Sequence, residues 1–136
     1  MSLTPIIAVH MTAALGAIAT GPVALWARKG SVQRPRLHRA FGYAWVTLMV
    51  VAATSAIFIP ARKLPLLFGF GPIHLLVLVT YSMLILAFWF LAHGKIRGHR
   101  LTMAGLYIGA CLVAGAFTLM PDRVLGQFVW GGLGLL

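Results

Sequence analysis

The stretch Gly71 to Phe90 reads GPIHLLVLVTYSMLILAFWF and contains no Asp, Glu, Lys or Arg. A helix needs about 20 apolar residues to cross the hydrocarbon core of a bilayer, and this run supplies them. Three further runs of similar length are Pro5 to Ala27, Leu37 to Ile59 and Leu101 to Met120. The sequence therefore predicts an all-α membrane protein of four transmembrane helices, joined by short connections into an up-down-up-down bundle.

The composition supports a single transmembrane domain over residues 1–136. Hydrophobic residues make up 61% of the chain and charged residues only 9%, whereas about a quarter of the residues in soluble domains are charged. No basic residue precedes the first run, which is also longer than the apolar region of a signal peptide, so we expect it to be retained. The apolar tail 124–136 is too short to span and is predicted to lie in the interface or to dock on a partner.

The charge is strongly asymmetric, with 11 Lys and Arg against one Asp and a net charge of +10. Three basic residues, Arg62, Lys63 and Arg123, lie on one side of the predicted bundle. The other eight lie in or beside the first and third loops: Arg28, Lys29, Arg34, Arg36, Arg39, Lys95, Arg97 and Arg100. The positive-inside rule then places these loops in the cytoplasm and the N-terminus in the periplasm of a bacterial inner membrane. Basic loops of this kind face anionic headgroups, and no nucleic-acid partner is expected.

The two halves of the chain, about 1–60 and 69–121, show a faint internal repeat. The first half contains WARKG (26–30) and then RPRLHRAFGYAW (34–45), and the second contains FLAHG (90–94) and then IRGHRLTMAGLY (96–107). His10 precedes Gly30 by 20 residues, and His74 precedes Gly94 by the same 20. Two antiparallel helix pairs in tandem would give a parallel repeat, so the sequence predicts a duplicated helical hairpin.

Four histidines fall at two predicted depths and form the candidate site. His10 and His74 lie in the first turns of helices that start outside, whereas His38 and His99 begin helices on the cytoplasmic side. Alternate helices of a bundle lie diagonally, roughly 12–14 Å apart, which is about the span of two imidazoles that share one iron. The pattern therefore predicts one or two b-type haems with the axial pairs His10–His74 and His38–His99. Their propionates could meet the adjacent Arg39 and Arg100.

The same residues restrict the function. Asp122 is the single carboxylate, which excludes catalysis by paired carboxylates, and zinc sites usually add cysteine or carboxylate to histidine. If the chain is an enzyme, we expect an electron-transfer oxidoreductase subunit that works with quinone or a partner redox protein. All four histidines, however, also lie near helix ends, where they can be plain interfacial anchors. A cofactor-free accessory subunit of a larger respiratory or photosynthetic complex, a homo-oligomer and a small transporter therefore stay open.

Several stretches resemble a family of small bacterial membrane proteins, the domain-of-unknown-function 2306 family. They are HRAFGYAW (38–45), PIHLLVLV (72–79) and GHRLTMAGLYIGACLVAGAFTLMPDR (98–123). The last of these stretches is the most specific for the family. This resemblance implies membrane topology and no particular activity. The two histidine pairs are also weakly similar in architecture to the cytochrome b561 class, which passes electrons through two b haems. That similarity implies His10 with His74 outside and His38 with His99 inside.

Overall fold

The computed structural model describes residues 3–60 and 71–136, and every regular element in these ranges is helical. The first three spans are α1 (Pro5–Trp26), α2 (Pro35–Ile57) and α3 (Pro72–Ala92). The fourth consists of α4 (Ile96–Leu106), the π-helix η1 (Tyr107–Val113) and α5 (Ala114–Thr118), and it is followed by α6 (Val124–Gly132). In the described ranges, four helices are long and apolar enough to cross a membrane. The predicted all-α, four-span fold is thus confirmed.

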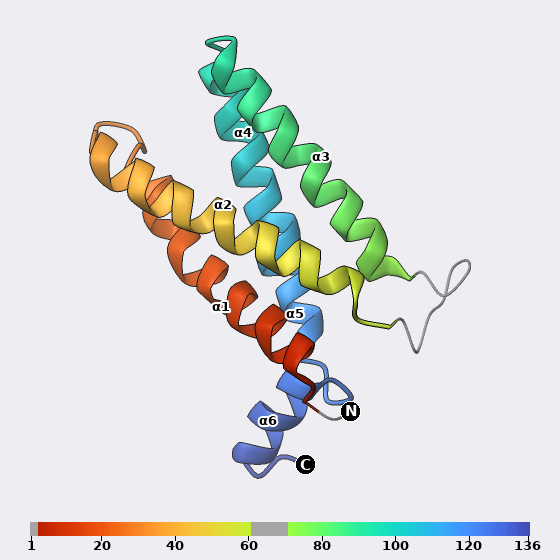
Figure 1. Cartoon of the computed structure of the whole chain (residues 1–136). Coiled ribbons are helices and arrows are strands. Elements are labelled where there is room, and N and C mark those ends of the chain that lie inside the picture. Colours follow the sequence, from red (N-terminus) through yellow and green to blue (C-terminus); the bar gives the residue numbers. More distant parts are fainter. Residues whose placement is uncertain (1–2, 61–70) are drawn as a thin grey trace.

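The helices alternate in direction, so the connections at 27–34 and 93–95 lie at one end of the molecule (Figure 1). We call this the basic end, and the end that carries the start of α1 and α6 the opposite end. Gly30 and Gly94 have φ angles of 58° and 70° in the two connections at the basic end. That left-handed conformation is readily accessible to glycine and ends a helix with a tight reversal. Each pair of antiparallel helices, α1 with α2 and α3 with α4, therefore forms a hairpin.

Proline begins three of the spans, at Pro5, Pro35 and Pro72. The first N–H groups of a helix have no intrahelical partner, so proline loses nothing there and presets the backbone angle. The fourth span instead begins at Ile96, ahead of the predicted Leu101. The charged stretch IRGHR is therefore the first turn of the helix and not part of the loop.

The core lies between the two hairpins in the middle of the bundle. Small residues of α1, Ala17 and Gly21, leave room for the larger side chains of α2 and η1. The main cluster of buried residues is Ala17, Trp45, Met49, Leu84, Leu106, Tyr107 and Cys111. A second cluster, Ala53, Ala56 and Val77, joins α2 to α3 nearer the opposite end. Contacts between the hairpins are therefore concentrated away from the basic end.

Pro22 inside α1 creates the most specific contact between the hairpins. Proline has no N–H, so the carbonyl of Ile18, four residues earlier, loses its helical donor. The Tyr107 hydroxyl from η1 donates to that carbonyl at 3.0 Å. α1 runs through Pro22 without a break, because the freed carbonyl is satisfied from the other hairpin. We call this contact the Tyr107–Ile18 bond.

The change Tyr107→Phe tests this bond. Removal of the hydroxyl leaves the Ile18 carbonyl without a donor in a low-dielectric setting, so we expect a loss of about 1 kcal/mol in the free energy of unfolding. The measurement is denaturant unfolding in mixed micelles. Tyr43→Phe is the control, because the Tyr43 side chain is 70% exposed. Equal losses for both variants would contradict the assigned role.

The outer surface of the spans is apolar, as a lipid environment requires. Exposed side chains that face outward include Leu78, Ile85 and Leu101. Such extensive exposed apolar surface is rare on soluble monomers. α6 also exposes apolar surface. It packs back on the end of α5, where the Trp130 Nε1–H donates to the Leu119 carbonyl at 2.6 Å. Its Phe128 is 83% exposed, and whether lipid or a partner covers this face stays a prediction.

Candidate functional site

His38 and His99 occupy equivalent places in the two hairpins. Each is the fourth residue of its helix, α2 or α4. His38 Nδ1 lies 2.8 Å from the Ala24 carbonyl oxygen in α1, and His99 Nδ1 lies 3.0 Å from the Ala87 carbonyl oxygen in α3. His38 is half-buried and His99 is 9% exposed. Both rings therefore bond the second helix of a hairpin to the first.

The Ala24 carbonyl shows why the chain places a ring nitrogen there. It lies in the last turn of α1, where carbonyl groups have no intrahelical donor, and an unsatisfied carbonyl is costly in a membrane. The tight reversal at Gly30 returns the chain so that the first turn of α2 lies beside this carbonyl. His38 thus supplies a donor that the end of α1 lacks.

His10 makes a similar contact toward the opposite end of the molecule. Its Nδ1 lies 2.8 Å from the Ala52 carbonyl oxygen and 3.3 Å from Ser55 Oγ, both in α2. The ring is half-buried between α1 and α2. Like the two histidines at the basic end, His10 therefore joins neighbouring helices through Nδ1.

These contacts assign the tautomer of three rings. A carbonyl oxygen only accepts, so Nδ1 of His10, His38 and His99 carries a proton, and in the neutral ring Nε2 then carries the lone pair. The hydrogen bonds that the described part of the chain makes to these three rings are all at Nδ1. A histidine bound to a metal usually has this arrangement, with one nitrogen donating to a carbonyl and the other free to ligate. Each of these three rings therefore keeps one nitrogen that could ligate a metal.

His74 is different, because both of its nitrogens are engaged. It is the third residue of α3, and its Nδ1 accepts a hydrogen bond from the Gly71 backbone N–H at 3.1 Å. This bond is the half of a capping box in which the side chain at the third helical position accepts from the N-cap N–H. Nε2, which then carries the proton, lies 3.3 Å from the Ile57 carbonyl oxygen at the end of α2. His74 would have to release Ile57 before Nε2 could bind a metal.

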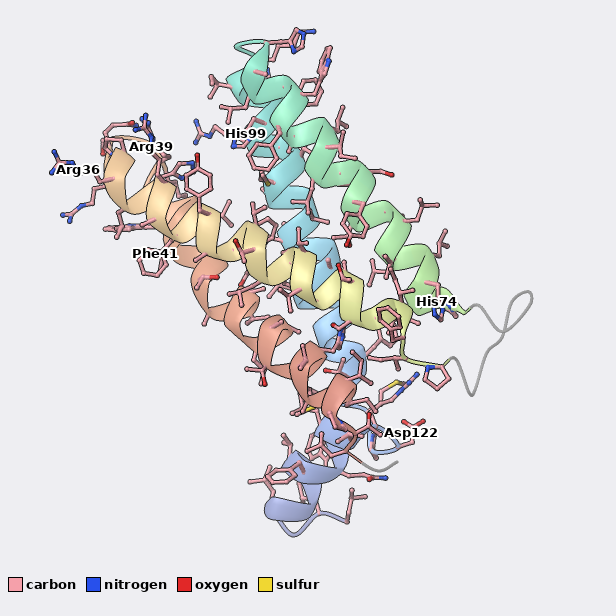
Figure 2. The ribbon with its side chains drawn as sticks, in the orientation of Figure 1. Arg36, Arg39, Phe41, His74, His99 and Asp122 are labelled. Carbon is pink, nitrogen blue, oxygen red and sulfur yellow. The ribbon has the colours of Figure 1, made fainter. Side chains whose placement is uncertain are left out.

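The structure brings the predicted pairs to common ends of the molecule but not into direct contact through the hydrogen bonds described. His10 and His74 both lie against the last third of α2, at Ala52 and Ile57. His38 and His99 each bond within their own hairpin, and Figure 2 shows His99 on the second hairpin and Arg39 at the tip of the first. Arg39 and Arg100 are exposed at the basic end beside these histidines.

His93 is the fifth histidine and has a local role. Its Nδ1 lies 2.8 Å from the Trp89 carbonyl oxygen, and its ring stacks on the Trp89 indole at 4.2 Å between centroids. The ring is exposed just after the end of α3. It caps its own helix and contacts no other helix through these bonds, which makes it a natural control for the histidines that join helices.

The sequence did not predict the buried aromatic pair at the centre of the molecule, Trp45 and Tyr107. Trp45, 5% exposed, has a buried Nε1–H without a hydrogen-bond partner among the described residues, and it lies next to Tyr107 at 6.5 Å between ring centroids. The π-helix η1 starts at this tyrosine, and π-helical turns often occur at functional sites. Pro22 within an apolar run is a signal that a carbonyl is freed. The donor, however, could be identified only from the packing.

The chain matches the model of the family described as predicted membrane protein (DUF2306), over residues 7–130. The matched region covers α1 from its third residue, the other three spans and most of α6. The chain belongs to the DUF2306 family. The resemblance noted in HRAFGYAW and GHRLTMAGLYIGACLVAGAFTLMPDR is thereby confirmed. No curated protein and no solved structure matches this DUF2306 protein significantly.

Proposed function

We propose that this DUF2306 protein is an integral membrane b-type haem protein that carries electrons. The observation that supports the proposal is the state of His38 and His99, whose Nδ1–H groups are held by backbone carbonyls while Nε2 is left as the basic nitrogen. Two such rings at one end of a bundle of spanning helices are the donor set that bis-histidine haem requires. The weak architectural similarity to the cytochrome b561 class belongs to this proposal.

The roles of the residues follow from their contacts. Nε2 of His38 and His99 would hold the iron, and the exposed Arg39 and Arg100 would meet the propionates through charge-assisted hydrogen bonds. The bonds to Ala24 and Ala87 fix the ring orientations and raise the basicity of the ligating nitrogens. When bound, haem supplies a reversible one-electron couple.

A second haem toward the opposite end is supported less strongly. His10 has the required free Nε2, but the predicted partner His74 donates from Nε2 to Ile57 and caps α3 with Nδ1. Binding at this end would therefore break one of the contacts that hold α2 and α3 together. We accordingly place the first haem at the basic end.

The distribution of basic residues gives the proposed orientation of the protein in the membrane. Eight of 11 basic residues lie at the basic end, so we place that end in the cytoplasm and the start of α1 in the periplasm of a bacterial inner membrane. Electrons would be exchanged with quinone or with a partner redox protein, and the chain would act as an electron-transfer oxidoreductase subunit. Asp122 is the single carboxylate, which leaves no pair of acids for bond-breaking chemistry.

The test is an optical spectrum and a pyridine haemochrome assay of the protein purified from cells supplied with a haem precursor. We expect a reduced-minus-oxidised α-band of b type, lost in His38→Ala and in His99→Ala because each removes one axial nitrogen. His93→Ala is the matched control and should keep the full haem content, since His93 bonds only to Trp89. A colourless wild-type protein that is folded by circular dichroism ends the haem proposal.

The second candidate function is a cofactor-free accessory subunit of a larger respiratory or photosynthetic complex. The observation that favours it is that the histidine bonds to the carbonyl groups of Ala24, Ala52 and Ala87 already join neighbouring helices without any metal. The exposed apolar face of α6 could then dock on another subunit or on a second copy. Under this reading the histidine variants lose stability and co-purification, and no spectroscopic signal is involved.

A further inference from the structure

The core of the bundle contains a group of sulfur side chains that the haem proposal does not use. Cys111 of η1 and Met49 of α2 are each 5% exposed, and the Cys111 thiol donates to Met49 Sδ at 3.7 Å. This contact lies where α2 crosses the fourth span (Figure 1). Met83 of α3 and Met103 of α4 are half-buried and pack against the same buried cluster. Both hairpins therefore contribute sulfur atoms to the core.

The sulfur atoms of Cys111 and Met49 are spaced like two ligands of one metal ion. With metal–sulfur bonds of about 2.3 Å, two sulfur atoms 3.7 Å apart subtend an angle of about 107° at the metal, which is close to tetrahedral. A thiol is only a weak donor and a thioether only a weak acceptor, so their hydrogen bond contributes little. Thiolate and thioether are, however, the ligands that select Cu(I).

The buried indole of Trp45 favours a thiolate at Cys111. Its Nε1–H has no hydrogen-bond partner among the described residues, although the side chain is 5% exposed. The N–H faces the Cys111 sulfur and would donate to it once the thiol has lost its proton. A neutral thiol is a poor acceptor, whereas an anionic sulfur accepts a charge-assisted hydrogen bond. Hydrogen bonds to metal-bound sulfur are a common means of tuning such sites. A metal-bound Cys111 would therefore give the Trp45 N–H its missing acceptor.

We propose that the core binds a single soft monovalent metal ion of the Cu(I) class between Cys111 Sγ and Met49 Sδ. The ion displaces the thiol proton, so a metal–sulfur bond replaces the S–H bond, the proton leaves to solvent and no electron is transferred. Met83 or Met103 supplies a third sulfur, because a methionine side chain is flexible enough to turn toward the ion. The ion then links α2 to η1 and so joins the two hairpins.

The ligands favour Cu(I) over divalent ions. One thiolate cancels the charge of a monovalent ion, whereas a divalent ion would leave a net charge buried among apolar side chains, which is costly. Zinc sites usually combine three or four Cys, His or carboxylate ligands, and no three such side chains come together in the part of the chain that the structure describes. The site uses none of the histidines, so it stands or falls independently of the haem proposal.

The experiment is an anaerobic titration of the full chain in neutral detergent with Cu(I), in competition with the chelator bicinchoninate. We expect the wild type to retain a single Cu(I) per chain, and X-ray absorption at the copper edge to show sulfur ligands. Cys111→Ser should abolish retention, because it removes the thiolate. Met49→Leu should weaken binding by about tenfold or more, since even groups outside the ligand shell contribute that much to metal affinity.

Met120→Leu is the matched control and should bind like the wild type, because Met120 is exposed beyond the end of α5. The double variant His38→Ala/His99→Ala should also retain Cu(I), which separates this site from the haem site. The proposal is overturned if the wild type loses Cu(I) to the chelator, if Cys111→Ser retains as much as the wild type, or if the copper has nitrogen ligands in place of sulfur.

Circular dichroism of each variant distinguishes loss of the site from loss of the fold. Met49→Leu keeps the volume and apolar character of the side chain, so it decides the question even if Cys111→Ser does not fold. Unchanged Cu(I) affinity in folded Met49→Leu would remove the thioether from the site and contradict the proposed pair.

Discussion

Gly21→Ala is expected to destabilise the bundle by about 2–3 kcal/mol, the largest effect of any single added methyl group within the spans. A Cβ at this position would lie 2.4 Å from Tyr107 Cε2, 2.5 Å from Tyr107 Cδ2 and 3.1 Å from Trp45 Nε1. The Tyr107 ring cannot simply turn away, because its hydroxyl is bonded to the Ile18 carbonyl one turn earlier in the same helix. The variant must therefore either separate α1 from η1 or break the Tyr107–Ile18 bond.

The measurement is the denaturant or thermal unfolding of the purified protein in mixed micelles. Gly42→Ala is the control, because a Cβ at Gly42 in α2 meets nothing within 4 Å. There alanine should be neutral or stabilising by about 0.5–1 kcal/mol, since it is the better helix former. If Gly21→Ala unfolds like the wild type, the described packing of Tyr107 against α1 is wrong.

The second large effect is expected for Gly126→Ala, which should displace α6 and leave the other helices in place. A Cβ at Gly126 would lie 1.9 Å from the Met120 carbonyl oxygen and 2.8 Å from the Leu119 carbonyl oxygen. These are backbone atoms at the end of the fourth span, so no side chain can move aside to make room. We expect α6 to leave its place and the Trp130 Nε1–H to lose its bond to Leu119.

Hydrogen exchange followed by mass spectrometry reports this change. A nine-residue helix is marginal without tertiary contacts, so amide exchange over 124–132 should accelerate about 100-fold if docking is weakened by about 3 kcal/mol. Exchange in α1 to α4 should stay as in the wild type. Gly131→Ala is the matched control within the same helix, because a Cβ there meets nothing within 4 Å. Equal protection of α6 in both variants would show that Gly126 is not a point of close approach.

The sequence was sufficient to predict the four spans, because the bilayer sets the length and polarity of any helix that crosses it. Runs such as Gly71 to Phe90 have no charged residue, and in lipid such a run must satisfy its own backbone as a helix. The start of the fourth span was placed too late, at Leu101 and not at Ile96, because hydropathy does not register a helix that continues into the headgroup region. The resemblance to DUF2306 was carried by linear motifs and was therefore also predictable.

The sequence singles out the histidines as unusual residues in a membrane-spanning chain, but the groups that they contact could not be derived from it. Sequence spacing suggested that His10 and His74 face each other across a diagonal. In the structure each of them bonds to α2, His10 at Ala52 and His74 at Ile57. Which carbonyl a ring nitrogen reaches depends on where each helix ends and how it packs, and neither is visible in a pattern of residue types. The haem pairing therefore stays a prediction that spectra must test.

The Tyr107–Ile18 bond has a consequence for how the protein is made. Ile18 is synthesised well before Tyr107, so the first hairpin enters the bilayer with an open carbonyl group at Pro22 that only the last span can close. Until Tyr107 has been synthesised, the Ile18 carbonyl of the growing chain lacks this hydrogen-bond donor within the lipid. Nascent chains that stop short of Tyr107 should therefore be preferred substrates for membrane proteases. Insertion of the fourth span thus supplies the donor that Pro22 removes from α1.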